Sequence, residues 1–273
     1  MSLSNASYAR INEDALRHAA ETARTLARLW KKRPALLGEW LRAQDVVFGA
    51  CAPLPDREEG LDEGLTPTER SRRAAERAYQ EAARLFYCED FPAASQAFQA
   101  IAASPDSPYQ NMGHYLAARA LVRQGLFARQ GDEASAPVQD PAVQAPFLEA
   151  EKLLGTVLAN PKQREAHAPA RRLLGIIRFR LAPEQRRCEL YSRVLEKGTG
   201  TALEAELIDF THLFSSEKTC PGLKGDAADL EAWLRMTWKE YGYAPRRRVR
   251  TRTTRRRSRG GRRRRACPGS SPR

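Results

Sequence analysis

The motifs that mark common catalytic sites are missing from this sequence. It contains no glycine-rich phosphate-binding loop, no G-x-S-x-G nucleophile motif and no H-E-x-x-H metal motif. It has only four histidines, and the pair Asp209 and His212 is more typical of a hydrogen bond on a helix surface than of an acid/base pair. We therefore predict a protein that is not an enzyme, with no catalytic residue and no cofactor.

Cysteine is also scarce. The five cysteines, Cys51, Cys88, Cys188, Cys220 and Cys267, are scattered, and none belongs to a C-x-x-C pair or completes a zinc pattern with histidine. This distribution predicts isolated thiols in a reducing compartment and no metal site.

Long apolar runs are absent as well. No run approaches the roughly 20 apolar residues that cross a bilayer, so no membrane span is predicted. The N-terminus, as written, lacks a basic segment followed by an apolar one, which argues against a signal peptide. We expect a cytoplasmic protein.

The net positive charge comes entirely from the C-terminus. The formal net charge is +13, but 14 of the 46 basic residues are the arginines between Arg246 and Arg273, which leaves 32 basic against 33 acidic residues elsewhere. The segment contains no lysine, acid or aromatic residue. Three hypotheses remain open: a disordered arm that binds nucleic acid non-specifically through Arg246 to Arg265, a targeting or membrane-surface patch, and an out-of-frame translation of a GC-rich gene.

The rest of the chain shows helical periodicity almost throughout. Apolar residues recur every three or four positions, and almost no segment alternates with period two. The sequence predicts an all-α protein built from antiparallel helix pairs. The expected helices are Tyr8–Lys32, Ala35–Ala50, Thr66–Cys88, Pro92–Ala103, Pro108–Gln124, Phe147–Ala159, Pro169–Leu181, Glu184–Lys197, Ala202–Phe214 and Ala227–Tyr241.

Breaks in this periodicity predict the domain organisation. An N-terminal helical pair (1–50) is followed by a proline-rich, acidic linker (51–67). A helical repeat domain covers 68–243 and contains an insertion at about 129–148, which is rich in proline and polar residues. A disordered arginine-rich tail completes the chain (244–273).

An internal repeat suggests how the helices are arranged. In "AYQEAARLFYCEDFPAASQAFQAIAASP", small and large residues fall at or next to the key positions of the tetratricopeptide repeat. "HYLAARALVRQGLFA" continues as "EAEKLLGTVLANP" after the insertion, and "ARRLLGIIRFRLAPEQRRCELYSRVLEKG" is a degenerate third unit, with Arg187 where a small residue is expected. Over about Thr68 to Gly198 the chain resembles a tetratricopeptide-repeat (TPR) protein.

The resemblance implies a superhelix whose concave groove binds a protein or peptide. The family's lysine and asparagine pattern for a chaperone's C-terminal carboxylate is absent. Aromatic and arginine side chains would instead suit a peptide that bears carboxylates. An alternative is that these arginines are only the solvated side of amphipathic helices. The groove residues that the resemblance implies are Tyr79, Phe86, Tyr115, Arg119, Arg123 and Arg172.

The segment from "LGEWLRAQDVVFGACAP" to "GHYLAARALVRQG" is also similar to an uncharacterised family of bacterial helical-repeat proteins. Members of that family are longer and often begin with export signals. If an N-terminal portion is missing here, the resemblance implies a periplasmic protein.

Overall fold

Helices make up all the regular structure that the computed structural model describes. It describes residues 3–49, 51–128, 138–196 and 201–240, and these ranges contain ten α-helices, one short 3-10 turn and no strand. The prediction of an all-α protein is confirmed for this part of the chain. The α-helices are α1 (Leu3–Leu29), α2 (Pro34–Gly49), α3 (Pro67–Tyr87), α4 (Phe91–Ala103), α5 (Gln110–Phe127), α6 (Pro141–Ala159), α7 (Arg164–Leu181), α8 (Pro183–Arg193), α9 (Thr201–Leu213) and α10 (Asp226–Glu240).

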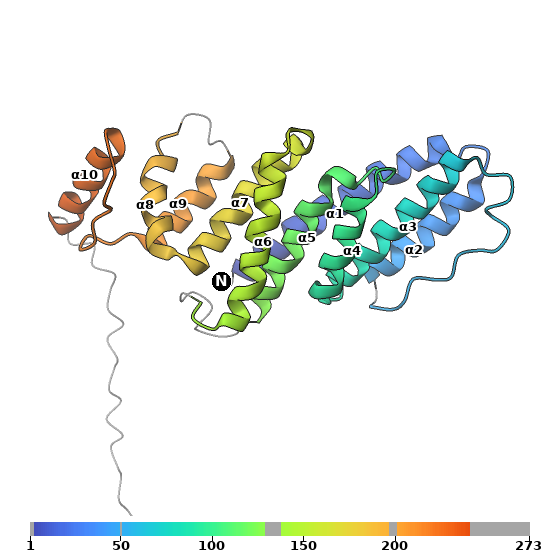
Figure 1. Cartoon of the computed structure of the whole chain (residues 1–273), viewed down its shortest axis with the longest axis horizontal. Helices are drawn as coiled ribbons and strands as arrows, with labels where there is room; N and C mark the ends of the chain where they lie inside the picture. The colour runs from blue at the N-terminus through green and yellow to red at the C-terminus, as the bar shows by residue number, and fades with distance from the viewer. Residues whose placement is uncertain (1–2, 50, 129–137, 197–200, 241–273) are drawn as a thin grey trace, which may run out of the picture.

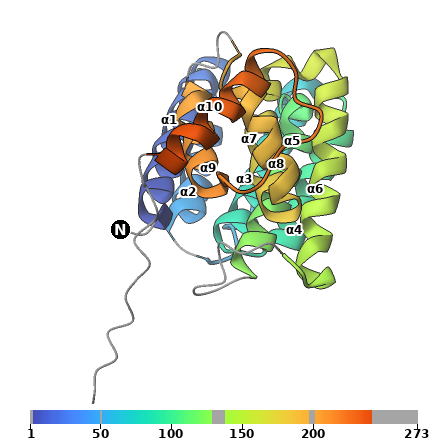
Figure 2. The ribbon, with the colours of Figure 1, turned by 90° about the vertical axis from the view of Figure 1, so that its left-hand side faces the viewer.

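The helices pack mainly against their neighbours in sequence. Contacts join α2 to α3, α3 to α4, and so on through α5, α6, α7, α8 and α9, and α10 packs on α8. Figure 1 shows these helices side by side in an elongated row, from α2 and α3 at one end to α10 at the other. Helix α1 breaks this order, because it runs lengthwise along one side of the row, as the end view in Figure 2 also shows.

The starts of α3 and α4 lie close to the predicted residues. Thr66 accepts a hydrogen bond from the Glu69 N–H, and the Glu69 carboxylate accepts one from the Thr66 N–H, so that a capping box begins α3. Asp90 caps α4 in a similar way through the Ala93 N–H. These local bonds explain why both starts could be read from the sequence.

Three helices begin five or more residues earlier than predicted, and one of them is α1, which starts at Leu3. Helix α6 starts at Pro141, after the cap Asp140, so the last part of the expected insertion at 129–148 is helical. Helix α7 likewise starts before its internal Pro169. In α6 and α7 the internal proline is close to the N-terminus. The carbonyl group that loses its hydrogen bond to the missing proline N–H therefore lies in the first turn. Proline there does not end a helix.

The prediction of isolated thiols is wrong for four of the five cysteines. Disulfides join Cys51 to Cys88 and Cys188 to Cys220, across 37 and 32 residues of sequence respectively. Such separations carry no local pattern, and only the packing of the helices brings the partners together. Cys267 lies outside the described residues, as does the whole arginine-rich tail.

The segment between α2 and α3 is anchored to both helices rather than being a free linker. Leu54 and Leu65 are buried, and Cys51 is linked to the residue that follows α3. Arg73 of α3 is buried and donates to the Glu39 carboxylate of α2, to Asp62 and to the Glu58 carbonyl. These contacts join α2 and the segment after it to α3.

Candidate functional site

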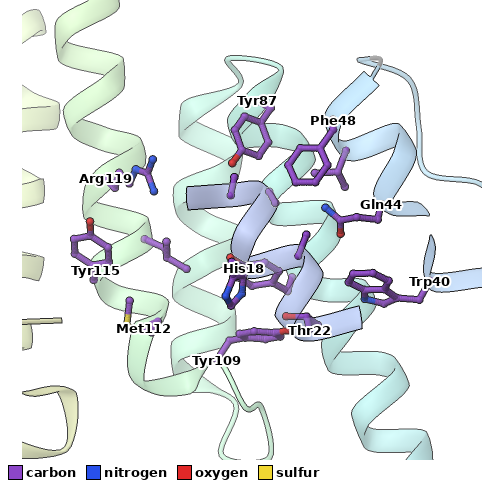
Figure 3. A pocket seen from close by; sticks show the side chains of 16 residues that line it. His18, Thr22, Trp40, Gln44, Phe48, Tyr87, Tyr109, Met112, Tyr115 and Arg119 are labelled. Carbon is purple, nitrogen blue, oxygen red and sulfur yellow. The ribbon is translucent and has the colours of Figure 1, made fainter. Parts of the chain in front are cut away.

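A partly open cavity of about 210 Å³ lies between α1, α2, α3 and α5. Helix α1 covers it with small side chains, including Ala15, Ala19 and Thr22. Figure 3 shows rings from α2, α3 and α5 surrounding the same space, with α1 crossing in front. The aromatic residues that line it are Trp40, Phe48, Tyr79, Tyr87, Tyr109 and Tyr115, together with the imidazole of His18.

The rings at the base of the cavity are packed against one another. Tyr79 stacks on Tyr109 with ring centroids 4.1 Å apart and meets Phe98 edge-on at 6.1 Å. His18 reaches from α1 to both tyrosines, at 5.7 and 6.1 Å. Burial raises the pKa of Tyr79 to about 12. The cavity therefore has a rigid aromatic floor that stays uncharged at neutral pH.

A buried carboxylate fixes the orientation of that floor. Glu76 is 1% exposed and accepts hydrogen bonds from the Tyr109 hydroxyl (2.9 Å) and from the Trp40 indole N–H (3.1 Å). Arg72 forms an ion pair with it at 2.7 Å. Burial and the charge of Glu76 raise the pKa of Tyr109. This carboxylate already has three partners, so its charge is not offered to the cavity.

Arg119 supplies the positive charge of the cavity lining. Its guanidinium lies over the Phe86 ring, 5.2 Å from the centroid, and projects from α5 toward the rings of α3 (Figure 3). Arg123, one turn further along α5, also approaches Phe86, at 5.9 Å. Within the described residues no carboxylate pairs with Arg119, whereas the buried Arg73 and Arg186 each have one.

The structure brings together most, but not all, of the side chains implied by the repeat pattern. Tyr79, Tyr115 and Arg119 line the main cavity. Phe86 is buried and lines a smaller cavity of about 40 Å³ that shares Arg119. Arg123 approaches the Phe86 ring but lines neither cavity. Arg172 is exposed on α7 and lines neither cavity.

Asp209, which the sequence places near His212 as a weak acid/base candidate, forms an ion pair with an arginine instead. Asp209 lies 2.9 Å from the guanidinium of Arg186, and His212 is exposed on the same helix. Burial raises the pKa of the Asp209 carboxyl, although Arg186 opposes this shift. Neither residue lines the two cavities described above. The pair joins α8 to α9 rather than forming part of a pocket.

Sequence reasoning missed the contribution of α1, α2 and the α5 N-cap. His18, Phe48 and Tyr109 lie outside the repeat positions, and their contact depends on how α1 lies across the repeats. Nothing in the sequence indicates the path of α1, on which these contacts depend.

Comparison with family models, with curated proteins and with solved structures found no match to this chain. Among the described residues, no helix is both long and apolar enough to cross a membrane. In the same part of the chain, no three potential metal ligands come together.

Proposed function

We propose that this protein is a non-enzymatic helical scaffold, with a TPR-like stack of helix pairs that binds a protein or peptide partner. The observation that carries the proposal is the aromatic cavity between α1, α3 and α5, with Arg119 in its lining. A cavity of this size and apolar character suits a single side chain better than a whole cofactor, since small-molecule sites usually measure about 300–1,000 Å³.

The row of consecutive helix pairs supports the same function. Pairs α3/α4, α5/α6 and α7/α8 follow one another along the molecule. Helical stacks of this kind present an extended surface on which a partner can make contacts with several helices. Helix α1 lies on that surface and forms one wall of the cavity, so any partner must bind beside α1 or displace it.

Two disulfides support action in an oxidising compartment, and for a bacterial chain that compartment would be the periplasm. Disulfides form and persist where thiols are not kept reduced, and they are rare in the cytosol. This proposal replaces the expectation of a reducing cytoplasm, which depended on reading the cysteines as isolated thiols.

Selection of peptides from a random display library on the full-length protein tests the proposed function. Selected peptides should lose most of their affinity for the Ala83→Leu variant, because Ala83 lines both cavities and the larger side chain fills them. The Arg172→Gln variant, changed at an exposed position on α7, should bind normally. Equal binding to both variants and to the unchanged protein would contradict the proposal. Circular dichroism and the melting temperature check that each variant is folded.

A further inference from the structure

We propose that the cavity binds an internal peptide segment in which an aromatic side chain is followed by an acidic residue and then by a small apolar one. This inference rests on the proposed function and names its ligand. In this arrangement the ring enters the larger cavity, the carboxylate pairs with Arg119, and the small side chain reaches the cavity beside Phe86.

The volume and lining of the larger cavity select an aromatic side chain. An apolar cavity of roughly 150 Å³ is enough to hold benzene, and this one measures about 210 Å³. Its floor is the stacked pair Tyr79 and Tyr109, and Tyr115 and Phe48 add further rings to the wall. Rings of this kind gain from edge-on or offset contact with another ring, beyond what burial alone provides.

The charge in the lining selects a carboxylate rather than a cation. Aromatic cages also bind ammonium groups, but here the guanidinium of Arg119 would repel one. Glu76 cannot offset that repulsion, because Arg72, Trp40 and Tyr109 already bind its carboxylate. Arg119 itself has no carboxylate partner in the described part of the chain. A carboxylate beside the bound ring would form charge-assisted hydrogen bonds with it.

The second cavity indicates that the bound segment continues past Arg119. It measures about 40 Å³, and Phe86 and Phe98 line it alone. The residues that it shares with the larger cavity are Tyr79, Ala83, Tyr87, Leu116 and Arg119. This space suits a small apolar side chain rather than a second ring, since an apolar cavity that holds benzene measures roughly 150 Å³. A carboxylate at the end of a chain would leave it empty, so the acid is expected inside the segment.

A nucleobase with its phosphate is the other ligand that combines a ring with negative charge. Single-stranded nucleic acid is usually held along a basic groove that follows many phosphates. The chain before the tail is close to neutral, and among the side chains that the structure describes Arg119 is the one arginine that lines the larger cavity. We therefore infer that the ligand is a peptide, and poly-uridine serves as the competitor in the test.

The probe is a short peptide, acetylated and amidated, in which phenylalanine, aspartate and valine are separated by single glycines. Titration calorimetry with the full-length protein at physiological salt should show that replacing aspartate with asparagine weakens binding by about tenfold or more. Replacing phenylalanine with alanine should weaken it at least as much. The Arg119→Gln variant should bind the aspartate and asparagine peptides equally, whereas Arg172→Gln should still prefer aspartate.

Three results would overturn the inference. These are equal affinity of the unchanged protein for the aspartate and asparagine peptides, an unchanged preference in Arg119→Gln, and displacement of the bound peptide from the unchanged protein by poly-uridine. If selected peptides bind the cavity but lack the aromatic and acidic pattern, this inference fails and the proposed function stands. If no peptide binding depends on Ala83, both fail.

Discussion

Arg73 illustrates how much a single residue depends on its tertiary surroundings. In the sequence it is one of several arginines at the start of a helix, and the ordinary expectation is a solvated side chain. The structure leaves it 4% exposed, bound to Glu39 at 2.6 Å and to Asp62 at 2.7 Å. Although burial opposes ionisation of Glu39, the hydrogen bonds and charge of Arg73 lower the pKa of that carboxyl. The Arg73 hydrogen bond also lowers the pKa of Asp62.

Replacing Arg73 with methionine is expected to destabilise the fold by about 3 kcal/mol, because it leaves Glu39 buried without its partner. Both carboxyl groups have lowered pKa values in the folded state. The stability that their ion pairs with Arg73 contribute is therefore fully present above their ordinary pKa values, 4.5 for Glu39 and 3.8 for Asp62. It is lost as the pH falls through the folded-state values. Urea unfolding should therefore show that the difference in free energy of unfolding between the unchanged protein and Arg73→Met narrows below about pH 4.5.

The exposed Arg172→Met variant provides the matched control, since a surface change should alter stability by less than about 0.5 kcal/mol. A difference between the unchanged protein and Arg73→Met that stayed constant from neutral to acidic pH would contradict the role given to Glu39 and Asp62.

Arg119 and Arg172 show the limit of repeat positions as a guide to a site. Both are arginines at positions that the repeat pattern assigns to the groove. Only Arg119 lies against rings from another helix, over Phe86 and beside the cavity. The difference comes from α1 and α2, which enclose the space around Arg119 and not the space around Arg172.

At the scale of helices, the contact between α4 and α5 depends on Gly113. A Cβ atom at this position would lie 2.6 Å from the Ala102 backbone nitrogen and 2.7 Å from the Phe98 carbonyl oxygen. Backbone atoms cannot move aside as a flexible side chain can. The two helices can therefore approach this closely only because the residue has no side chain.

Gly113→Ala is expected to lower the free energy of unfolding by about 1–3 kcal/mol, because α4 and α5 must separate to accommodate the methyl group. Gly155→Ala is the control, because no atom lies within 4 Å of a Cβ built there in α6. Alanine should stabilise that helix by up to about 1 kcal/mol. Thermal unfolding compares the two variants. A Gly113→Ala variant as stable as the unchanged protein would contradict the close contact between α4 and α5.

At the scale of the whole molecule, the two disulfides tie the connecting segments to the row of helices. One joins the segment after α2 to the end of α3, and the other joins α8 to the segment before α10. The buried Arg187 adds to the second link by donating to the Lys218 and Thr219 carbonyls. The predicted third repeat has this arginine where the TPR pattern would have a small residue.

Reduction should therefore lower stability, by about 2–4 kcal/mol for each disulfide in the simple chain-entropy treatment. Peptide mapping of unreduced protein produced in an oxidising compartment should recover Cys51 linked to Cys88 and Cys188 linked to Cys220. The Cys188→Ser, Cys220→Ser double variant should melt at a lower temperature and become less sensitive to reductant. Unmodified thiols at all four positions would contradict both the pairing and the proposed compartment.

The arginine-rich tail gives a separate prediction for the whole chain. Full-length protein should retain poly-uridine at low salt and release it steeply as salt rises, as expected for contacts with phosphates alone. Deleting residues 245–273 should abolish this retention, because the remaining chain is close to neutral. If retention survives the deletion, the helical body itself binds nucleic acid, which contradicts both the role of the tail and the proposed peptide scaffold.

The sequence by itself determined the helices and most of their ends, because apolar periodicity, N-caps such as Thr66 and Asp90, and prolines at helix starts are local properties. It also indicated Tyr79, Tyr115 and Arg119, since repeat positions mark one side of each helix. Only the tertiary structure decided that α1 covers that side, that Glu76 holds Tyr109 and Trp40 together, and that four cysteines pair. Those outcomes join residues more than 30 positions apart, and such contacts arise from packing that no local pattern encodes.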